Sequence, residues 1–244
     1  MSEHRSGNPH PSFRCFVTGT DTGVGKTLVS AALVNALARA GLKAAGMKPL
    51  AAGAEMRDGQ LWNEDVALLT AQASVDLPVD LVCPLMFREA AAPHIAAALE
   101  NRTIDLDVVL HAYQEMSRQT QALVVEGVGG FRVPLTDRLD TADLAAAMQL
   151  DVILVVGLRL GCLNHALLTA EAIAARGLKL AGWVANQIDP AMPHQADNLD
   201  ALSQRLAAPL LGVVRWMPVP SAAEAAGCLD VSRLPGWPSL SASA

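Results

Sequence analysis

Glycines, a lysine and a threonine stand close together near the start of the chain, in the stretch Gly19–Thr27 (GTDTGVGKT). A short apolar run ends before this stretch at Val17, and a helix-like segment follows from Leu28. A strand, a glycine-rich loop, Lys-Thr and a helix in this order are typical of a phosphate-binding P-loop. The backbone N–H groups of such a loop converge on phosphate oxygens, and the helix N-terminus adds partial positive charge. We therefore expect Lys26 to reach the outer phosphates of a nucleotide and the Thr27 hydroxyl to bind Mg²⁺.

The loop departs from the usual pattern at its first glycine. The pattern G-x-x-x-x-G-K-[ST] would place that glycine at Thr20, whereas the chain has it one residue earlier, at Gly19. The loop is therefore either one residue longer or begins on a non-glycine, which indicates a subclass of the P-loop proteins. An ordinary glycine-rich loop is the alternative interpretation.

A second lysine, Lys48, closes the apolar run that ends at Met47. We expect this strand end to lie beside the phosphate loop, where a further cation could balance phosphate or carboxylate charge. The alternative is a solvated lysine at the end of a strand.

An acid, Glu126, ends the apolar run Ala122–Glu126 and is followed by Gly127, Gly129 and Gly130. This layout resembles the Walker B element, which normally carries Asp. A carboxylate that closes a buried strand is unfavourable without a cation or hydrogen bonds, and Mg²⁺ prefers oxygen ligands. The glycines allow a ligand to approach the backbone closely. A capped or salt-bridged structural glutamate remains the alternative.

Two further polar residues have more than one interpretation. Asn63 can cap a helix whose first turn holds Glu64 and Asp65, so spacing alone does not favour a metal role for Asp65 over a capping role. Asn186 ends another apolar run, where its amide could bind the edge of a nucleobase or form an Asx turn.

The elements that must position these residues alternate between short apolar runs and longer helical patterns. Such alternation predicts an α/β fold: one P-loop NTPase domain with a mostly parallel sheet and helices on both faces. Gly41 and Gly177 are expected to end two of the helices. The predicted strands are Cys15–Thr18, Ala45–Pro49, Ala122–Glu126, Val152–Gly157, Ala181–Asn186 and Leu210–Val214. The predicted helices are Leu28–Ala40, Glu64–Ala73, Leu106–Gln119, Thr141–Gln149, Asn164–Arg176 and Gln195–Leu206.

Composition narrows the class of protein. The 244 residues suit one domain, which we place at residues 13–234, between flexible segments at 1–12 and 235–244. A net charge of −6 without a long basic run argues against a nucleic-acid partner. No secretory or membrane-spanning segment is evident, so we expect a cytoplasmic protein without a membrane partner. The four cysteines are too scattered for a thiolate metal site and are expected to be reduced and mostly buried.

Seven sequence blocks together resemble one family, dethiobiotin synthetase. In order and spacing the match runs from Phe13 to about Leu234, and it includes the variant P-loop. The blocks are GTDTGVGKT, MKPLAAG, WNEDVALL, VVEGVGG, VILVVGLRLGCLNHALLTAEAI, LAGWVANQI and APLLG. The resemblance implies a homodimeric enzyme of biotin synthesis that uses ATP, Mg²⁺ and CO₂ or bicarbonate to close a ureido ring on 7,8-diaminononanoate. It implies a carbamate intermediate and then a carbamic–phosphoric anhydride.

The resemblance also assigns roles to residues. It implies that Lys26 and Lys48 are catalytic, and that Thr27, Asp65 and Glu126 hold the metal. The nucleotide would be bound by Thr22, Gly23, Val24, Gly25, Lys26, Thr27, Leu28, Asp65, Glu126, Gly127, Val128, Gly129, Asn186, Gln187, Arg215, Trp216 and Met217. The substrate would be bound by Lys48, Ala52 and the turn of Gly161, Cys162, Leu163 and Asn164. This turn would come from the partner subunit and offer a helix N-terminus to the substrate carboxylate.

Three positions depart from the family pattern, namely Ala52 in place of a hydroxyl residue, Asn198 in place of a Tyr and Arg215 in place of a Pro. These changes bear on substrate affinity and nucleotide preference.

Three rival interpretations follow from the P-loop itself. A switch ATPase of the partitioning or nitrogenase-iron-protein class would carry a lysine where the chain has Asp21. A cobyrinate-type amidation domain would normally come with a glutaminase domain, for which no length is left. A non-enzymatic regulatory nucleotide-binding module is the third.

Overall fold

The six predicted strands form one parallel sheet. The computed structural model describes residues 13–238, and the strands pair within it in the order β10-β9-β8-β1-β7-β2. The predicted fold class is thereby confirmed, with strand bounds that differ from the prediction by two residues or fewer. These strands are β1 (Phe13–Gly19), β2 (Ala44–Met47), β7 (Ala122–Glu126), β8 (Val152–Gly157), β9 (Leu180–Asn186) and β10 (Leu210–Val214).

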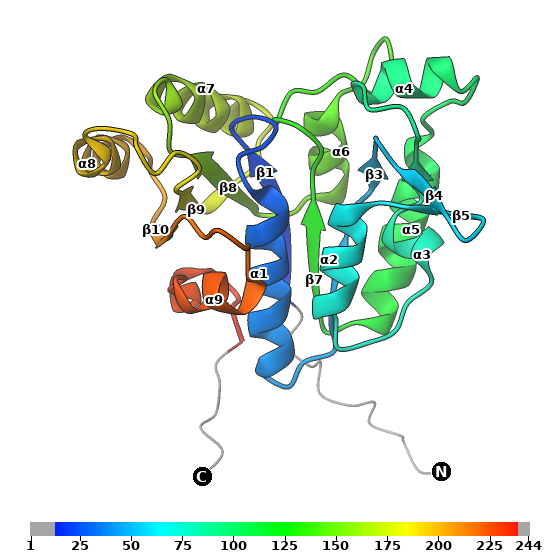
Figure 1. The fold of residues 1–244 in the computed structure, drawn as a ribbon, viewed down its shortest axis with the longest axis horizontal. Coiled ribbons are helices and arrows are strands. Elements are labelled where there is room, and N and C mark those ends of the chain that lie inside the picture. The colour runs from blue at the N-terminus through cyan, green and yellow to red at the C-terminus, as the bar shows by residue number, and fades with distance from the viewer. Residues whose placement is uncertain (1–12, 239–244) are drawn as a thin grey trace, which may run out of the picture.

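Helices cover both faces of this sheet, because successive residues of each buried strand point to opposite faces. In β1, Cys15 and Val17 pack into one apolar cluster with α1 and α9, whereas Phe16 packs into another with α5 and α6. Helices α7 and α8 extend the second layer over β8 and β9 (Figure 1). The helices are α1 (Lys26–Arg39), α5 (Leu106–Gln119), α6 (Thr141–Met148), α7 (Cys162–Ala175), α8 (Gln195–Arg205) and α9 (Ala222–Gly227).

A group of short elements at the β2 edge of the sheet was not predicted. They contain two to seven residues each, too few for hydrophobic periodicity to show in the sequence. Together with α2 (Glu64–Gln72), they build the part of the molecule beyond β2 (Figure 1). They are β3 (Leu50–Ala51) paired with β6 (Leu85–Met86), the hairpin of β4 (Glu55–Arg57) and β5 (Gln60–Trp62), and the helices α3 (Val79–Val82) and α4 (Pro93–Leu99). A 3₁₀ turn at Val231–Arg233, near the C-terminal end, was likewise not predicted.

The C-terminal end of the described residues packs against the start of β1. The ring of Trp237 packs edge-on against Phe13, with 5.0 Å between ring centroids. The tail predicted from Pro235 is therefore anchored at least as far as Trp237, while residues 1–12 and 239–244 lie outside the described residues. No helix among the described residues is long and apolar enough to cross a membrane. Cys15, Cys83 and Cys162 are buried, as expected, and Cys228 is partly exposed.

Candidate active site

Strand register brings Lys48 and Glu126 together. Met47 of β2 pairs with Val125 of β7, so the next residues, Lys48 and Glu126, emerge side by side at the carboxyl edge of the sheet. The Lys48 Nζ lies 2.6 Å from Glu126 Oε1. We expected the end of β2 to lie beside the phosphate loop, but β7 separates β2 from β1. Lys48 therefore reaches the loop region through Glu126 rather than by strand adjacency.

Lys48 is the buried centre of an ion-pair cluster. Its Nζ also lies 2.8 Å from Asp65 Oδ2, and the lysine is only 4% exposed, which rules out the solvated strand-end lysine. Burial lowers the pKa of Lys48, but attraction from the Glu126 and Asp65 carboxylates outweighs burial and raises it overall. Burial raises the pKa of Asp65, but Lys48 and the Thr27 hydroxyl outweigh it and hold that pKa below its usual value. Lys48 and Asp65 are therefore both charged at neutral pH.

The cap of α2 explains how Asp65 reaches this cluster. The Asn63 side chain accepts hydrogen bonds from the backbone N–H groups of Asp65 and Val66, at 3.1 and 3.4 Å, so the predicted cap is confirmed. This cap leaves the Asp65 carboxylate free to contact Lys48 on one oxygen and Thr27 on the other. A helix cap and a metal role for Asp65 are therefore compatible, because Asn63 makes the cap.

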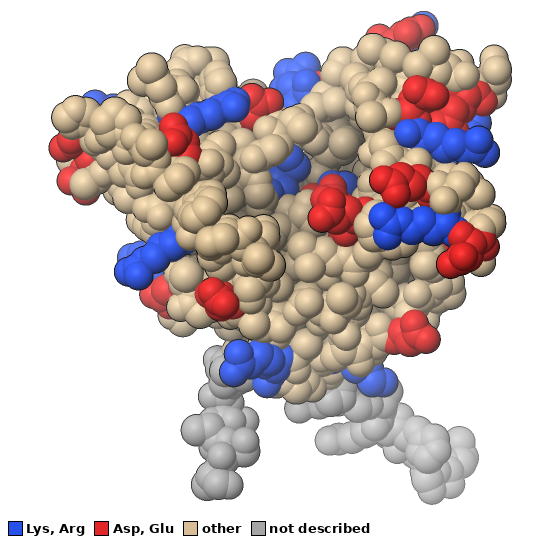
Figure 2. Space-filling model, viewed as in Figure 1, with Lys and Arg blue, Asp and Glu red and all other residues tan. Residues whose placement is uncertain are grey.

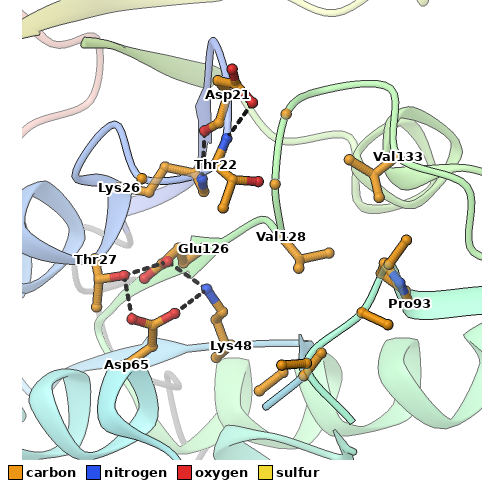
Figure 3. Close-up of a pocket in the computed structure, with 18 of the residues that line it drawn as sticks. Asp21, Thr22, Lys26, Thr27, Lys48, Asp65, Pro93, Glu126, Val128 and Val133 are labelled. Carbon is orange, nitrogen blue, oxygen red and sulfur yellow. Dashed lines mark hydrogen bonds and ion pairs between the residues drawn. The ribbon is translucent and has the colours of Figure 1, made fainter. Parts of the chain in front are cut away.

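Three side-chain oxygens at the cluster fit a magnesium ion. Thr27 Oγ1 lies 2.8 Å from Asp65 Oδ1 and 2.9 Å from Glu126 Oε1 (Figure 3). The hydroxyl has one proton and can donate to only one of these carboxylates. Adjacent oxygen ligands of an octahedral ion with bonds of about 2.1 Å lie about 2.9 Å apart. In addition, Glu126 Oε2 is buried without a hydrogen-bond partner among the described residues, which suits a bound cation.

The side chain of Lys26 is held by a hydrogen bond to the backbone of the phosphate loop. Lys26 Nζ donates to the Asp21 carbonyl at 3.0 Å, and the Asp21 carboxylate pairs with Arg159 of the loop before α7. Burial, and secondarily the nearby charge of Lys48, lower the pKa of Lys26 to about 8. Gly25 has a φ of +89°, and a Cβ there would lie 2.0 Å from Asn186 Nδ2. Only glycine therefore fits at this point of the loop.

A cavity of about 980 Å³ opens at this end of the sheet (Figures 2 and 3). Basic and acidic side chains gather around its mouth (Figure 2). The predicted residues that line it are Thr22, Gly23, Gly25, Lys26, Thr27, Lys48, Ala52, Asp65, Glu126, Val128 and Gly129. Both proposed catalytic lysines and all three proposed metal ligands therefore share one cavity.

Five of the residues expected to bind the nucleotide lie outside that lining, at the ends of β9 and β10. Asn186 is the last residue of β9 and Gln187 follows it, whereas Arg215–Met217 follow β10. Asn186 is buried, and its Nδ2 donates to the Val24 carbonyl at 2.9 Å, so its amide contacts the phosphate loop. The Trp216 backbone N–H donates to Gln187 Oε1 at 3.3 Å. Val24, Leu28 and Gly127 also lie outside the cavity lining.

The turn Gly161–Asn164 begins α7 and does not line the cavity of its own chain. Next to it, Leu160 is 95% exposed, and Leu168 on the same helix is 56% exposed.

Sequence reasoning missed one wall of the cavity. This wall contains Ala51, Ala90–Pro93, Gly130, Arg132 and Val133. Pro93 at the first turn of α4 is a helix-start signal, but α4 is too short to show periodicity. The segment after Gly130 could have been predicted as part of the site, because it directly continues the glycine loop after Glu126.

The sheet order, the phosphate loop and the acid closing β7 define a P-loop NTPase. A family model described as "AAA domain" matches residues 14–224. The chain is 54% identical over 231 residues to the ATP-dependent dethiobiotin synthetase BioD of Janthinobacterium sp. (strain Marseille), which covers 93% of this chain and 98% of that protein. The chain belongs to the dethiobiotin synthetase family.

Solved structures of more distant proteins share the fold alone. The signal recognition particle receptor FtsY of Elizabethkingia anophelis, in complex with GDP, has a TM-score of 0.50 at 13% identity, covering 91% of this chain and 62% of that one. The MinC:MinD cell division complex of Aquifex aeolicus also gives 0.50, at 17% identity, covering 85% of this chain and 83% of the matched chain.

Proposed function

We propose that this protein catalyses the ATP-dependent closure of a ureido ring on 7,8-diaminononanoate with CO₂, which forms dethiobiotin for biotin synthesis. The observation that carries the proposal is the Lys48–Asp65–Glu126 cluster, in which Lys48 and Glu126 are buried, beside a phosphate loop in one cavity. The 54% identity over nearly the whole chain to a named dethiobiotin synthetase supports it.

The reaction uses the diamine, CO₂ and ATP in three steps. One amine of the substrate adds to CO₂ and loses a proton, which gives a carbamate. A carbamate oxygen then attacks the γ-phosphorus of ATP, the bond to the bridging oxygen breaks, and ADP leaves. The neighbouring amine attacks the carbonyl carbon of this carbamic–phosphoric anhydride and loses a proton, and phosphate leaves with the electron pair of the C–O bond. The products are dethiobiotin, ADP and phosphate.

The two lysines answer the main difficulty of this reaction, which is the approach of two anions. Lys26 closes the phosphate loop, so its ammonium suits the outer phosphates of ATP. Lys48 is fixed between two carboxylates, and its ammonium suits the region where carbamate and γ-phosphate meet. Charge that is already in place at the moment of reaction usually makes the largest contribution to such catalysis.

Thr27, Asp65 and Glu126 would hold Mg²⁺. When bound, the ion supplies positive charge that neutralises phosphate oxygens. The two carboxylates have a second task, since they keep Lys48 charged while it is buried.

We also propose that the active form is a homodimer in which the Gly161–Asn164 turn of one copy approaches the cavity of the other. This turn begins a 14-residue helix, and its exposed neighbours Leu160 and Leu168 would be covered by a second copy. Sedimentation analysis of the protein and of a Leu160→Asp, Leu168→Asp variant tests this. A dimer that survives both substitutions would contradict the proposed interface.

Mass spectrometry of the reaction products tests the proposed activity. Incubation with diaminononanoate, ATP, Mg²⁺ and ¹³C-labelled bicarbonate should give a cyclic urea that contains one labelled carbon. Phosphate release should require both the diamine and bicarbonate. A switch ATPase would release phosphate without either, and a regulatory module would bind ATP without release, so both rivals predict a different result.

A further inference from the structure

The cavity changes character from one end to the other. Its inner end holds the charged cluster of Lys48, whereas its outer wall is built by Ala51, Ala52, Ala90–Pro93, Val128 and Val133. Val128, Val133 and Pro93 lie on the side of the cavity away from Thr27 and Asp65 (Figure 3). Such a wall suits a hydrocarbon chain, because burial of apolar surface is favourable. Among the described residues, the cations that line the cavity are Lys26, Lys48 and Arg132.

Arg132 lines the same cavity and is next in sequence to Val133, which is part of the apolar wall. Its Nε donates to Asp140 Oδ2, and its terminal nitrogens have no hydrogen-bond partner among residues 13–238. Asp140 is itself held firmly, because its Oδ1 caps α6 through the N–H groups of Ala142 and Asp143. The guanidinium is therefore held on one side and open on the other.

The backbone next to Arg132 is also fixed. The Val133 N–H donates to Thr141 Oγ1 at 3.0 Å, and the Thr141 N–H donates to the Val133 carbonyl at 3.0 Å. The loop that carries Arg132 is thus attached to the start of α6 through the backbone of Val133 and the side chain of Arg132. A guanidinium with two free N–H₂ groups is suited to bind a carboxylate through paired hydrogen bonds.

We propose that Arg132 binds the carboxylate of the substrate and so selects diamines that carry an acid at the far end of an aliphatic chain. The inference rests on the proposed function, because it takes its ligand from that reaction. The diamine end lies at the charged cluster, the chain lies along the alanine and valine wall, and the carboxylate meets Arg132. Arg132 is the contact supplied by the protomer that holds the reacting groups, and the Gly161–Asn164 turn is the contact supplied by the second copy.

A substrate comparison tests this assignment. The KM and kcat are measured for 7,8-diaminononanoate and for its primary amide, which has no charge at that end, with the parent protein and Arg132→Gln. The KM for the acid should rise about tenfold, as expected for a charge-assisted contact at a half-exposed site. The kcat and the KM for the amide should stay within about twofold, because the reacting end is untouched. Arg132→Lys should restore part of the affinity for the acid.

Arg138→Gln is the matched control. Arg138 is an exposed arginine of the same loop that does not line the cavity, so the same change of charge there should leave both KM values unchanged. Equal rises for acid and amide in Arg132→Gln would make Arg132 a structural partner of Asp140 and overturn the proposal. No rise for either substrate would assign the carboxylate to the Gly161–Asn164 turn alone and overturn it equally.

Calorimetry without nucleotide separates this inference from the proposed function. If the parent protein forms no cyclic urea, the proposed function fails. A tenfold weaker binding of the acid, with unchanged binding of the amide, would still support Arg132 as a carboxylate site. If the cyclic urea forms and Arg132→Gln leaves both binding and KM unchanged, the function stands and the inference fails.

Discussion

The two sides of the phosphate loop are built from different kinds of residues. On the side of β7 and β2, Lys48, Asp65 and Glu126 form a charged cluster whose atoms are 2.6–2.8 Å apart. On the side of β9 and β10, Asn186 and Gln187 contribute neutral amides, and Trp216 is 48% exposed. The residues of the first side line the cavity, whereas those of the second side do not.

This difference corresponds to two tasks that the proposed reaction would separate. Negative charge must be stabilised where carbamate and γ-phosphate meet, which requires cations held in place before the reaction starts. A nucleobase is neutral, and an amide that can both donate and accept suits its edge. Substitutions on the two sides should therefore affect different quantities, namely the rate of the reaction on one side and nucleotide affinity on the other.

The largest effect is expected for Lys26→Ala at the boundary between the sides. Loss of the contact to the transferred phosphoryl group should raise the barrier by about 4 kcal/mol, so that product formation falls about a thousandfold. Circular dichroism should show an unchanged fold. Product formation at a near-normal rate would contradict the role of Lys26.

Lys48→Gln should separate the two sides most clearly. The amide keeps a hydrogen-bonding head but loses the charge, so ring closure should fall by roughly two orders of magnitude or more. ATP affinity measured by calorimetry should persist, because the loop and Lys26 are unchanged. Equal losses of affinity and rate would make Lys48 a nucleotide ligand only, and no loss in either would remove it from the mechanism.

Glu126→Gln should change the response to metal. The substitution keeps the shape of the side chain but removes a charge that Mg²⁺ prefers, so the midpoint of the Mg²⁺ titration of activity should rise about tenfold. An Mg²⁺ titration curve identical to that of the parent protein would show that Glu126 is structural.

Asn186→Ala tests the neutral side. The substitution removes the donor to the Val24 carbonyl and, in the proposed site, an amide that faces the base. The KM for ATP should rise about fivefold, equivalent to about 1 kcal/mol for one hydrogen bond. The rate at saturating ATP should stay within about twofold. A fall in that rate as large as for Lys48→Gln would abolish the distinction between the two sides.

The smallest expected effect is a proton taken up on nucleotide binding. Lys26 has a pKa of about 8 because of its burial. Phosphate favours the charged form and raises that pKa, so at a pH of about 8.5 binding should take up a fraction of one proton. Calorimetry in two buffers of different ionisation enthalpy measures this uptake. Lys26→Arg, which stays charged throughout this range, should abolish the uptake, and persistence of the uptake would assign it to another group.

Much of the fold was predictable from local pattern. The six strands of the main sheet are continuous apolar runs, and such runs can be recognised in the sequence without knowledge of their neighbours in the fold. Four candidate residues were found because each stands where a strand or loop ends, namely Lys26, Thr27, Lys48 and Glu126. The elements beyond β2 other than α2 were missed because each has seven residues or fewer, and such short segments are held by their neighbours rather than by their own propensity.

Residue types and spacing alone determined that the chain has a phosphate loop in an α/β sheet, and which polar residues end its strands. Only the tertiary structure decided how those residues meet. The strand order placed β7 between β1 and β2, the register set Lys48 against Glu126, and the cap at Asn63 turned Asp65 toward both Lys48 and Thr27. It also brought Arg132, which no motif marks, to the cavity. These contacts join residues far apart in the sequence, so they follow from packing of the whole sheet and not from local preference.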